Sequence, residues 1–358
     1  MLDPTTPAPP APAPPARPSP PAEALVDAWP QARLMPLTGW IERNRFHPLL
    51  AALLVFVLAF LLFQLVIAPI VLGVGVVLGA VGSGTEPTMA DVMEQLTSNL
   101  PLLMTANTIG QVLGFGLLAW VVARRHTREA GEFLRVRRPD GPGLALAALG
   151  WMVLYPAVLW TGQLNESIPL PESIRVLEQT QVDLIEGLLL GGELNTAFLF
   201  VALALTPAIC EELLFRGYLQ RQVERGWGTV ASIVVVGVLF GLYHLRLSQA
   251  IPLSLLGVYL GFVVWATGSL WAGVLVHLLN NGLAVVASAV ARRSPDVDLD
   301  AIEAAGVPWY FGVGGLLAAG VVARVMAARR FQQAGPEPDS RPVGPPPPTA
   351  PLSTPLPT

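Results

Sequence analysis

The longest apolar run in the chain covers residues 49–81 and reads LLAALLVFVLAFLLFQLVIAPIVLGVGVVLGAV. Its 33 residues include no charged side chain, whereas about 20 apolar residues in a helix suffice to cross the hydrocarbon core of a bilayer. The stretch therefore predicts a transmembrane helix. Because it exceeds one span, we expect it to tilt, to kink near Pro69 or to re-enter the membrane.

Seven further apolar runs follow along the chain. They lie at residues 100–122, 144–162, 188–214, 229–243, 251–267, 270–291 and 309–325. The runs at 229–243 and 251–267 are short, and two Gly-x-x-x-Gly patterns, at residues 237–241 and 257–261, indicate close packing between helices. The sequence therefore predicts an all-α, polytopic helical membrane protein with about eight transmembrane helices.

The composition excludes several other classes of protein. Hydrophobic residues make up 53% of the 358 residues and charged residues 13%, whereas about 25% of an average soluble domain is charged. So little charge cannot coat one soluble domain, and so many aliphatic residues exclude a chain that is disordered throughout. The net charge of −4, without a basic stripe, argues against a nucleic-acid partner. The single cysteine, Cys210, excludes an internal disulfide and a Cys-rich zinc site.

Proline is concentrated at the two ends of the chain. Residues 1–40 hold 12 prolines and residues 331–358 another 10. Alternating proline and alanine lack the aliphatic side chains that a core needs, and they favour the extended polyproline II conformation. Both ends are therefore predicted to be disordered tails.

The charges of the loops predict how the helices are oriented. Arginines gather before the first run, between the second and third, after the fourth and at the end of the last, whereas the other loops are mainly acidic. Arg292 and Arg293 are exceptions, but neighbouring acidic residues offset their positive charge. Because basic loops stay on the inner side, both termini are predicted to be cytoplasmic. All 21 basic residues are arginine, and this composition resembles that of a high-GC bacterium, which predicts a multi-pass protein of the bacterial cytoplasmic membrane.

Ionisable residues inside a span are informative, because a charge in the bilayer costs at least ~2.5–3.5 kcal/mol on insertion scales. The first such cluster is Glu211, Glu212 and Arg216, near the end of the fourth run. Glu212 and Arg216 are four residues apart, so they share one helix face and can pair. Glu211 points about 100° away and lacks that partner, which suits a general base. The alternative is that all three form a polar cap at the membrane edge.

Two more clusters lie in later spans. His244 lies in the fifth run, and His277 precedes Asn281 by four residues in the seventh, so that the latter two project together. His244 could instead be a hydrogen-bonded packing residue, and His277 and Asn281 polar contacts between helices. The remaining histidines, His47 and His126, stand at span edges beside arginines and are interpreted as interfacial.

Together the clusters suit hydrolysis within the membrane. Glu211, His244 and His277 follow one another at intervals of 33 residues, on helices that a bundle can bring together. A carboxylate and a histidine could deprotonate a water, while a second histidine and Asn281 donate hydrogen bonds to an oxyanion. The same three side chains could instead hold zinc, with a water as the fourth ligand. Motifs of other intramembrane proteases, such as His-Glu-x-x-His, are absent from the sequence.

The three clusters, in this order, resemble the motifs of the CPBP family, which comprises CAAX prenyl endopeptidases and bacteriocin-processing or immunity (Abi) proteins. The resemblance is carried by Glu211-Glu212-x-x-x-Arg216, Phe240-x-x-x-His244 and His277-x-x-x-Asn281. It covers roughly residues 198–291 and includes the turn at residues 267–270. No position of the three motifs departs from the family pattern.

The resemblance implies an intramembrane endopeptidase whose conical catalytic cavity opens to the cytosol and the membrane. By position, Glu211 and His244 would activate the water, and His277 and Asn281 would hold the oxyanion. The supporting residues would be Glu212, Arg216 and Phe240. A metal-free, glutamic-type mechanism without a cofactor is favoured, because the motifs supply no obvious second shell for a metal. Zinc held by Glu211, His244 and His277 is the alternative.

On this interpretation the chain has five parts. They are a cytoplasmic tail at 1–40, transmembrane helices and loops at 45–187, a CPBP catalytic core at 188–291, a last transmembrane helix at 308–330 and a second cytoplasmic tail at 331–358. The expected partners are the lipid bilayer and a membrane-associated or lipid-anchored peptide or protein substrate, which enters from the membrane or the cytosol. The oligomeric state stays open. The alternative functions are a non-catalytic scaffold or bacteriocin-immunity protein that retains the fold and, less favoured, a transporter.

Overall fold

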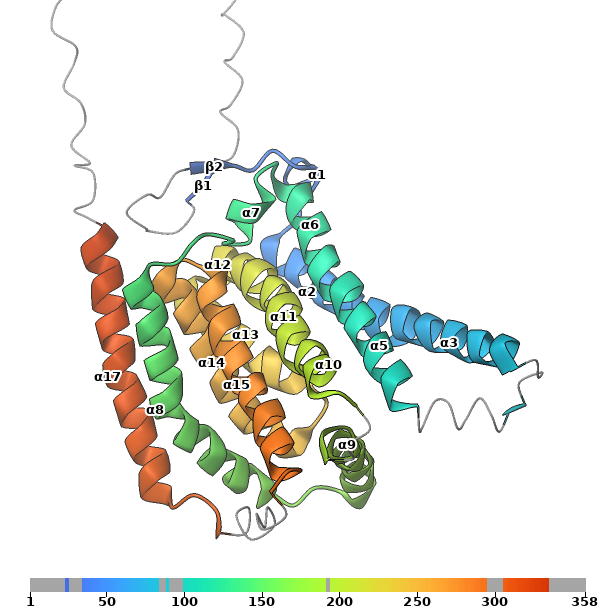
Figure 1. The fold of residues 1–358 in the computed structure, drawn as a ribbon. Helices are drawn as coiled ribbons and strands as arrows, with labels where there is room; N and C mark the ends of the chain where they lie inside the picture. The colour runs from blue at the N-terminus through green and yellow to red at the C-terminus, as the bar shows by residue number, and fades with distance from the viewer. Residues whose placement is uncertain are drawn as a thin grey trace, which may run out of the picture.

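The computed structural model describes residues 23–25, 34–83, 88–89, 99–190, 194–294 and 305–334. Within these residues the protein consists of helices apart from one pair of short strands (Figure 1). The helical segments long and apolar enough to cross a membrane are Pro48–Gly82, Leu100–His126, Gly141–Glu166, Thr196–Trp227, Leu247–Thr267, Leu270–Ala291 and Trp309–Gln332. The remaining predicted run forms a shorter apolar helix, Thr229–Tyr243. The prediction of an all-helical, polytopic membrane fold is confirmed.

The individual elements are shorter than these spans because π-helical turns divide several of them. The strands are β1 (Glu23–Leu25) and β2 (Leu34–Pro36). The helices are α1 (Trp40–Arg43), α2 (Pro48–Leu61), α3 (Ala68–Ser83), α5 (Leu100–Gln111), α6 (Leu118–His126), α7 (Ala130–Phe133), α8 (Gly141–Glu166), α9 (Glu172–Leu190), α10 (Thr196–Phe200), α11 (Thr206–Glu212), α12 (Gln220–Trp227), α13 (Thr229–Tyr243), α14 (Ala250–Thr267), α15 (Leu270–Ala291) and α17 (Trp309–Ala334). The π-helical turns are η1 (Leu62–Ile67), η2 (Val112–Leu117), η3 (Val201–Leu205) and η4 (Leu213–Leu219), and η5 (Leu247–Gln249) is a 3-10 turn.

Two of the π-helical turns directly precede a proline. Pro69 is the second residue of α3, after η1, and Pro207 is the second residue of α11, after η3. Proline has no amide hydrogen for the helical ladder, and its ring clashes with the carbonyl four residues earlier. A wider turn at this point lets the helix continue past the proline. The first apolar run is therefore one helical segment rather than a re-entrant loop.

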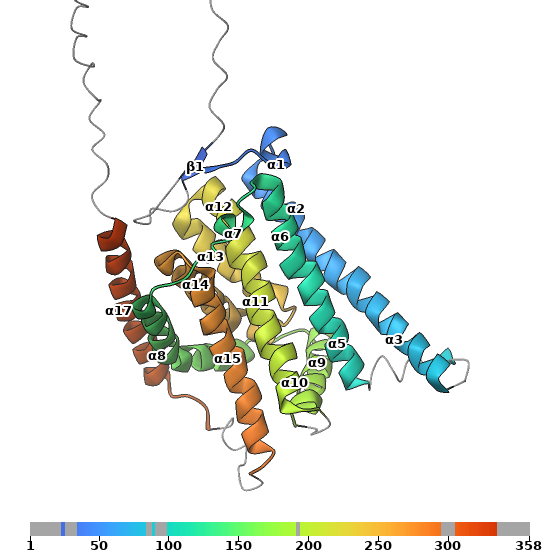
Figure 2. The ribbon, with the colours of Figure 1, turned by 45° about the horizontal axis from the view of Figure 1, so that its top comes forward.

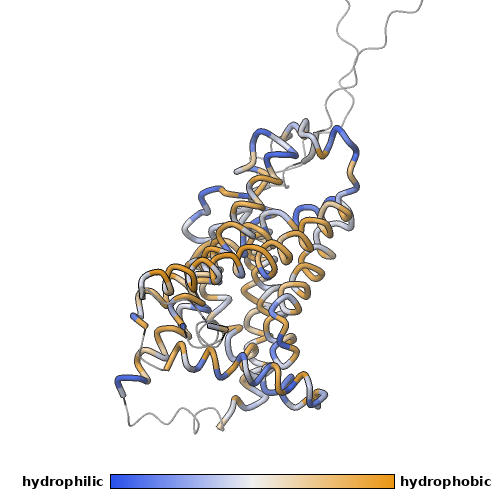
Figure 3. The backbone as a smooth tube through the Cα atoms, turned by 90° about the vertical axis from the view of Figure 1, so that its right-hand side faces the viewer, coloured by the Kyte–Doolittle hydropathy of each residue, from blue (hydrophilic) through white to orange (hydrophobic). Residues whose placement is uncertain are grey.

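The segment from α10 to α12 runs through the middle of the bundle (Figures 1 and 2). Helices α13, α14 and α15 lie beside it, with α2, α3, α5 and α6 on one flank and α8 and α17 on the other. Hydropathy along the backbone follows this arrangement, since apolar residues fill the helices and hydrophilic residues gather near the helix ends (Figure 3). Edge-to-face aromatic pairs pack on the first flank, where Phe63 lies 5.1 Å from Phe115, and between the central segment and α13, where Phe215 lies 5.3 Å from Phe240, measured between ring centroids.

Glycines let α13 and α14 approach until their backbones touch. A Cβ atom on Gly257 would lie 2.5 Å from the carbonyl oxygen of Gly237, and one on Gly237 would lie 2.6 Å from the amide nitrogen of Val258. Only a residue without a side chain fits at either position. The two Gly-x-x-x-Gly patterns therefore mark a helix–helix contact.

A capped turn fixes the start of α15. Gly268 ends α14 with a φ of 64°, in the left-handed region that glycine adopts without strain. The hydroxyl of Ser269 then accepts a hydrogen bond from the amide of Trp271 at 3.2 Å and donates to the carbonyl of Arg137 at 2.5 Å. The turn positions the helix that carries the third sequence motif.

Three features differ from the sequence analysis. Helix α9 includes residues 172–187, expected in an acidic loop, and residues 188–190, expected at the start of the fourth apolar run, whose span begins instead at Thr196. Within the predicted N-terminal tail, Met35 and Leu37 are buried and β1 pairs with β2, whereas residues 1–22 and 26–33, like the C-terminal tail from 335, lie outside the described residues. His126 ends its span, as expected, but its side chain is 1% exposed and lies between helices rather than on the surface of the protein.

Candidate active site

Helix α11 ends in two buried carboxylates, and the turn η4 continues it to a buried arginine. Glu211, Glu212 and Arg216 are 6%, 0% and 0% exposed. As the spacing predicts, Arg216 donates to Oε1 of Glu212 at 2.8 Å. Arg216 also donates to the carbonyl of Gly257 at 3.0 Å, and its guanidinium lies 4.4 Å from the centre of the Phe240 ring. The arginine therefore ties α14 and α13 to the central segment.

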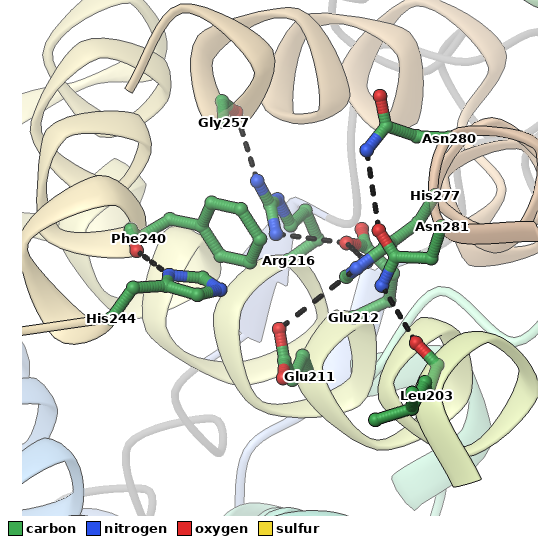
Figure 4. A network of polar contacts seen from close by, with 10 residues as sticks. All are labelled: Leu203, Glu211, Glu212, Arg216, Phe240, His244, Gly257, His277, Asn280 and Asn281. Carbon is green, nitrogen blue, oxygen red and sulfur yellow. Dashed lines mark hydrogen bonds and ion pairs between the residues drawn. The ribbon is translucent and has the colours of Figure 1, made fainter. Parts of the chain in front are cut away.

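Glu212 also contacts His277 of the third motif, and the sequence did not predict this contact. Nδ1 of His277 lies 3.0 Å from Oε1 of Glu212 (Figure 4). The imidazole therefore donates a hydrogen bond to the same oxygen that accepts one from Arg216. Close contact with α15 at this level depends on Gly273, where a Cβ atom would lie 2.7 Å from Oε2 of Glu212. Glu212 thus orients the imidazole of His277.

Glu211 faces the other side of the same imidazole. Its Oε2 lies 4.0 Å from Nε2 of His277, beyond hydrogen-bond distance, and among the described residues this oxygen has no hydrogen-bond partner. A buried carboxylate oxygen without a partner is costly, because it loses its solvation without gaining a hydrogen bond. Oε2 of Glu211 therefore has the capacity to accept a hydrogen bond from a water or a substrate group.

His244 lies at the end of α13 with one ring nitrogen occupied. Its Nδ1 lies 2.7 Å from the carbonyl oxygen of Phe240. Because a carbonyl only accepts, Nδ1 carries the hydrogen and the neutral ring keeps a free lone pair on Nε2. Figure 4 shows this second nitrogen pointing toward the group formed by Glu211 and His277. Among the described residues, however, no direct hydrogen bond or ion pair joins His244 to Glu211.

Asn281 is held in place by three groups that the sequence analysis did not assign. Its Nδ2 donates to the carbonyl of Leu203, in η3, at 3.1 Å. Its Oδ1 accepts from Asn280 at 3.2 Å, and Asn280 accepts from Nε1 of Trp151 at 3.4 Å. Asn280 could have been suspected as the neighbour of a motif residue. Trp151 and Leu203 are distant in sequence and carry no signal.

The zinc alternative can be compared with the arrangement of the possible ligands. Among the described residues, no three His, Cys, Asp or Glu side chains are grouped closely enough to hold a metal ion. Glu211, His244 and His277 therefore do not fit a metal site in this geometry.

A comparison with family models gives a match over residues 193–283, to the family described as type II CAAX prenyl endopeptidase Rce1-like. No curated protein and no solved structure matched the chain. The matched range runs from the start of the central segment into α15, and it contains all seven residues that carry the three motifs. Residues 193–283 therefore form a domain of the Rce1-like CAAX prenyl endopeptidase (CPBP) family.

Proposed function

We propose that this protein is an intramembrane endopeptidase that hydrolyses a peptide bond in a membrane-associated or lipid-anchored protein or peptide. Membership of its central domain in a CAAX endopeptidase family supports a peptidase. The observation that carries the proposal is the buried Oε2 of Glu211, which has no hydrogen-bond partner among the described residues and faces Nε2 of His277 at 4.0 Å.

Glu211 would act as the general base. A water beside its Oε2 and Nε2 of His244 would lose a proton to Glu211 as its oxygen bonds to the carbonyl carbon of the substrate. Asn281 and His277 would donate hydrogen bonds to the oxyanion that forms. When the C–N bond breaks, Glu211 would return the proton to the leaving amine. This is a glutamic-type, cofactor-free mechanism, in which His277 donates from Nε2 only as an imidazolium, because Nδ1 already serves Glu212.

The remaining motif residues would position the reacting groups. Glu212 orients His277 and is itself held by Arg216. The Phe240 ring lies 4.9 Å from His244 and 5.6 Å from His277, edge to face in both cases, so it sets the separation of the two imidazoles. The conical cavity expected around these groups stays a prediction.

The proposed location is the bacterial cytoplasmic membrane, with both termini in the cytoplasm. Figure 1 shows α1 and the last turn of α17 at the same end of the bundle. The arginine-rich loop after α6 and helix α12, which carries Arg221 and Arg225, lie at that end as well, as the positive-inside rule requires of a cytoplasmic face. The substrate would enter from the membrane or from that face.

The test is cleavage of a membrane-anchored reporter peptide by the purified protein, with Glu211→Gln and His244→Ala beside the parent. Both variants should lose about 100-fold or more of the cleavage rate, the magnitude typical of a lost acid–base group. Glu186→Gln, an exposed carboxylate on α9, is the matched control and should cleave like the parent. Parental rates for Glu211→Gln would refute the catalytic assignment and favour the scaffold or immunity alternative.

A further inference from the structure

The chain leaves the helical path directly after His244. Helix α13 has 15 residues and is about 22 Å long at 1.5 Å per residue, less than the hydrocarbon thickness of about 30 Å. Leu245, the residue after His244, has a φ of 54°, and the chain does not resume a regular α-helix before Ala250. The polar backbone groups of this turn therefore lie outside a regular helix, so the protein must satisfy those that water does not reach.

Two buried polar side chains from other helices satisfy the turn. Asn165, near the end of α8, donates to the carbonyl of Leu247 at 2.8 Å and accepts from the amide of Ile251 at 2.8 Å. Glu178, on α9, accepts from the amides of Leu247 at 2.5 Å and Ser248 at 3.2 Å. The carboxylate thus caps the start of the helical segment that leads into α14.

Glu178 is exceptional within its helix. Most side chains of α9 are half-buried or exposed, including Val176 and Leu177, whereas Glu178 is 5% exposed. Figure 1 shows α9 nearly end-on, lying across the ends of the spans at the end opposite to α1. A helix in this position, with exposed apolar side chains, suits the membrane interface. Its one buried carboxylate points inward, to the turn that follows His244.

We propose that Glu178 is a positioning residue for the His244 imidazole, through its hydrogen bonds to the Leu247 and Ser248 amides. The inference rests on the proposed protease function. Only two residues separate His244 from Leu247, so a shift of the turn moves the C-terminal end of α13 and with it Nε2 of His244. Displacement of a reacting group by about 1 Å can lower a catalytic rate about 100-fold.

The charge state of Glu178 supports this role. Burial raises the pKa of the carboxyl, but hydrogen bonds from Ser248 and from the Leu247 and Ser248 amides, together with the charge of Arg246, outweigh that effect and lower it below its ordinary value. The group is therefore ionised at neutral pH. Hydrogen bonds to a charged acceptor are stronger than neutral ones, which suits a carboxylate that holds a turn.

The first measurement is steady-state cleavage of the reporter by the full chain carrying Glu178→Ala or Glu178→Gln, with Glu186→Ala on the same helix as the exposed control. For Glu178→Ala we expect kcat to fall about 10- to 100-fold while KM changes less than about twofold, because the reacting group moves and the binding groups do not. Glu178→Gln keeps one acceptor oxygen and should lose less. Glu186→Ala should match the parent.

The second measurement does not require activity. In Glu178→Ala, amide hydrogen exchange of residues 245–251 should accelerate about tenfold or more. The acylation rate of His244 by diethyl pyrocarbonate, followed by mass spectrometry, should change relative to that of the exposed His47. Parental exchange, acylation and kcat in Glu178→Ala would overturn the inference. If Glu211→Gln cleaves normally while exchange and acylation do change, the protease proposal fails but Glu178 still positions the turn.

Discussion

The protein contains two clusters in which one glutamate bridges an arginine and a histidine. In the inner cluster Glu212 contacts Arg216 at 2.8 Å and His277 at 3.0 Å. In the outer cluster Glu42, on α1, contacts Arg225 at 2.9 Å and His126 at 2.7 Å. The three residue types and the contacts are the same. The two clusters differ in what occupies the second nitrogen of the histidine.

In the outer cluster every position around the imidazole is occupied. Nε2 of His126 lies 3.1 Å from the hydroxyl of Tyr218 and 3.0 Å from the amide nitrogen of Gln222, both of which can donate to it. The ring also stacks on Phe133 at 4.9 Å. In the inner cluster, by contrast, Nε2 of His277 faces Oε2 of a second carboxylate, Glu211, and this oxygen has no hydrogen-bond partner among the described residues. The comparison indicates that the outer cluster fastens α1 to the bundle, whereas the inner cluster keeps capacity for chemistry.

The largest effect on stability is expected from breaking the inner ion pair. Arg216→Met leaves Glu212 buried without its cation, and removing one partner of a buried pair costs about 3–5 kcal/mol. Thermal unfolding in detergent should show a large fall in midpoint. Glu212→Gln should destabilise more than Glu211→Gln, because Glu212 holds both Arg216 and His277, whereas Oε2 of Glu211 has no hydrogen-bond partner among the described residues. Equal midpoints for Glu211→Gln and Glu212→Gln would contradict the division of roles between the two carboxylates.

A smaller effect is expected from the glycine contact on which the inner cluster depends. Gly257→Ala would place a methyl group 2.5 Å from the carbonyl oxygen of Gly237. The carbonyl of Gly257 itself accepts a hydrogen bond from Arg216. Overpacking of this kind costs about 1–3 kcal/mol. Gly314→Ala is the control, because nothing lies within 4 Å of a Cβ atom there. Unfolding midpoints that are the same for both variants would show that α13 and α14 are not in contact at this point.

The smallest effect is expected from the outer cluster, and it should depend on pH. Burial raises the pKa of Glu42, but hydrogen bonds with His126 and Arg225 outweigh it and lower the pKa below the ordinary value of 4.5. The contribution of Glu42 to stability is therefore complete at pH values above its ordinary pKa. It is lost as the pH falls through the lowered pKa of the folded protein. Glu42→Gln should cost about 1–2 kcal/mol at pH 7 and reduce the acid sensitivity of unfolding. A variant as acid-sensitive as the parent would exclude Glu42 as the titrating group.

Local patterns predicted those parts of the molecule that depend on short-range order. The lengths of the apolar runs predicted the membrane-spanning helices, because a helix needs a minimum length to cross a bilayer. The four-residue spacing gave the Glu212–Arg216 pair, since both side chains come from one continuous helical segment. The two Gly-x-x-x-Gly patterns gave the contact between α13 and α14.

Features that depend on packing between distant helices could not be predicted in this way. Nothing near Glu212 in sequence indicates that it also accepts a hydrogen bond from His277, 65 residues later. Helix α9 was missed because its apolar residues are interrupted by acidic ones, which suggested a loop, and the buried state of Glu178 depends on the turn it caps. The burial of His126 was not predicted, because its neighbouring arginines suggested an exposed position, whereas its partners come from α1 and from the central segment.

The most direct test of the account compares cleavage by Glu211→Gln and Glu42→Gln on the same membrane-anchored reporter, with each rate corrected for the folded fraction. The account predicts that Glu211→Gln loses about 100-fold or more of the rate while it unfolds at or above the parental midpoint. Glu42→Gln should keep the rate within about threefold and unfold earlier, since it lacks only a structural contact. Parental cleavage by Glu211→Gln, or an equal loss in both variants, would contradict the assignment of the inner cluster as the catalytic one.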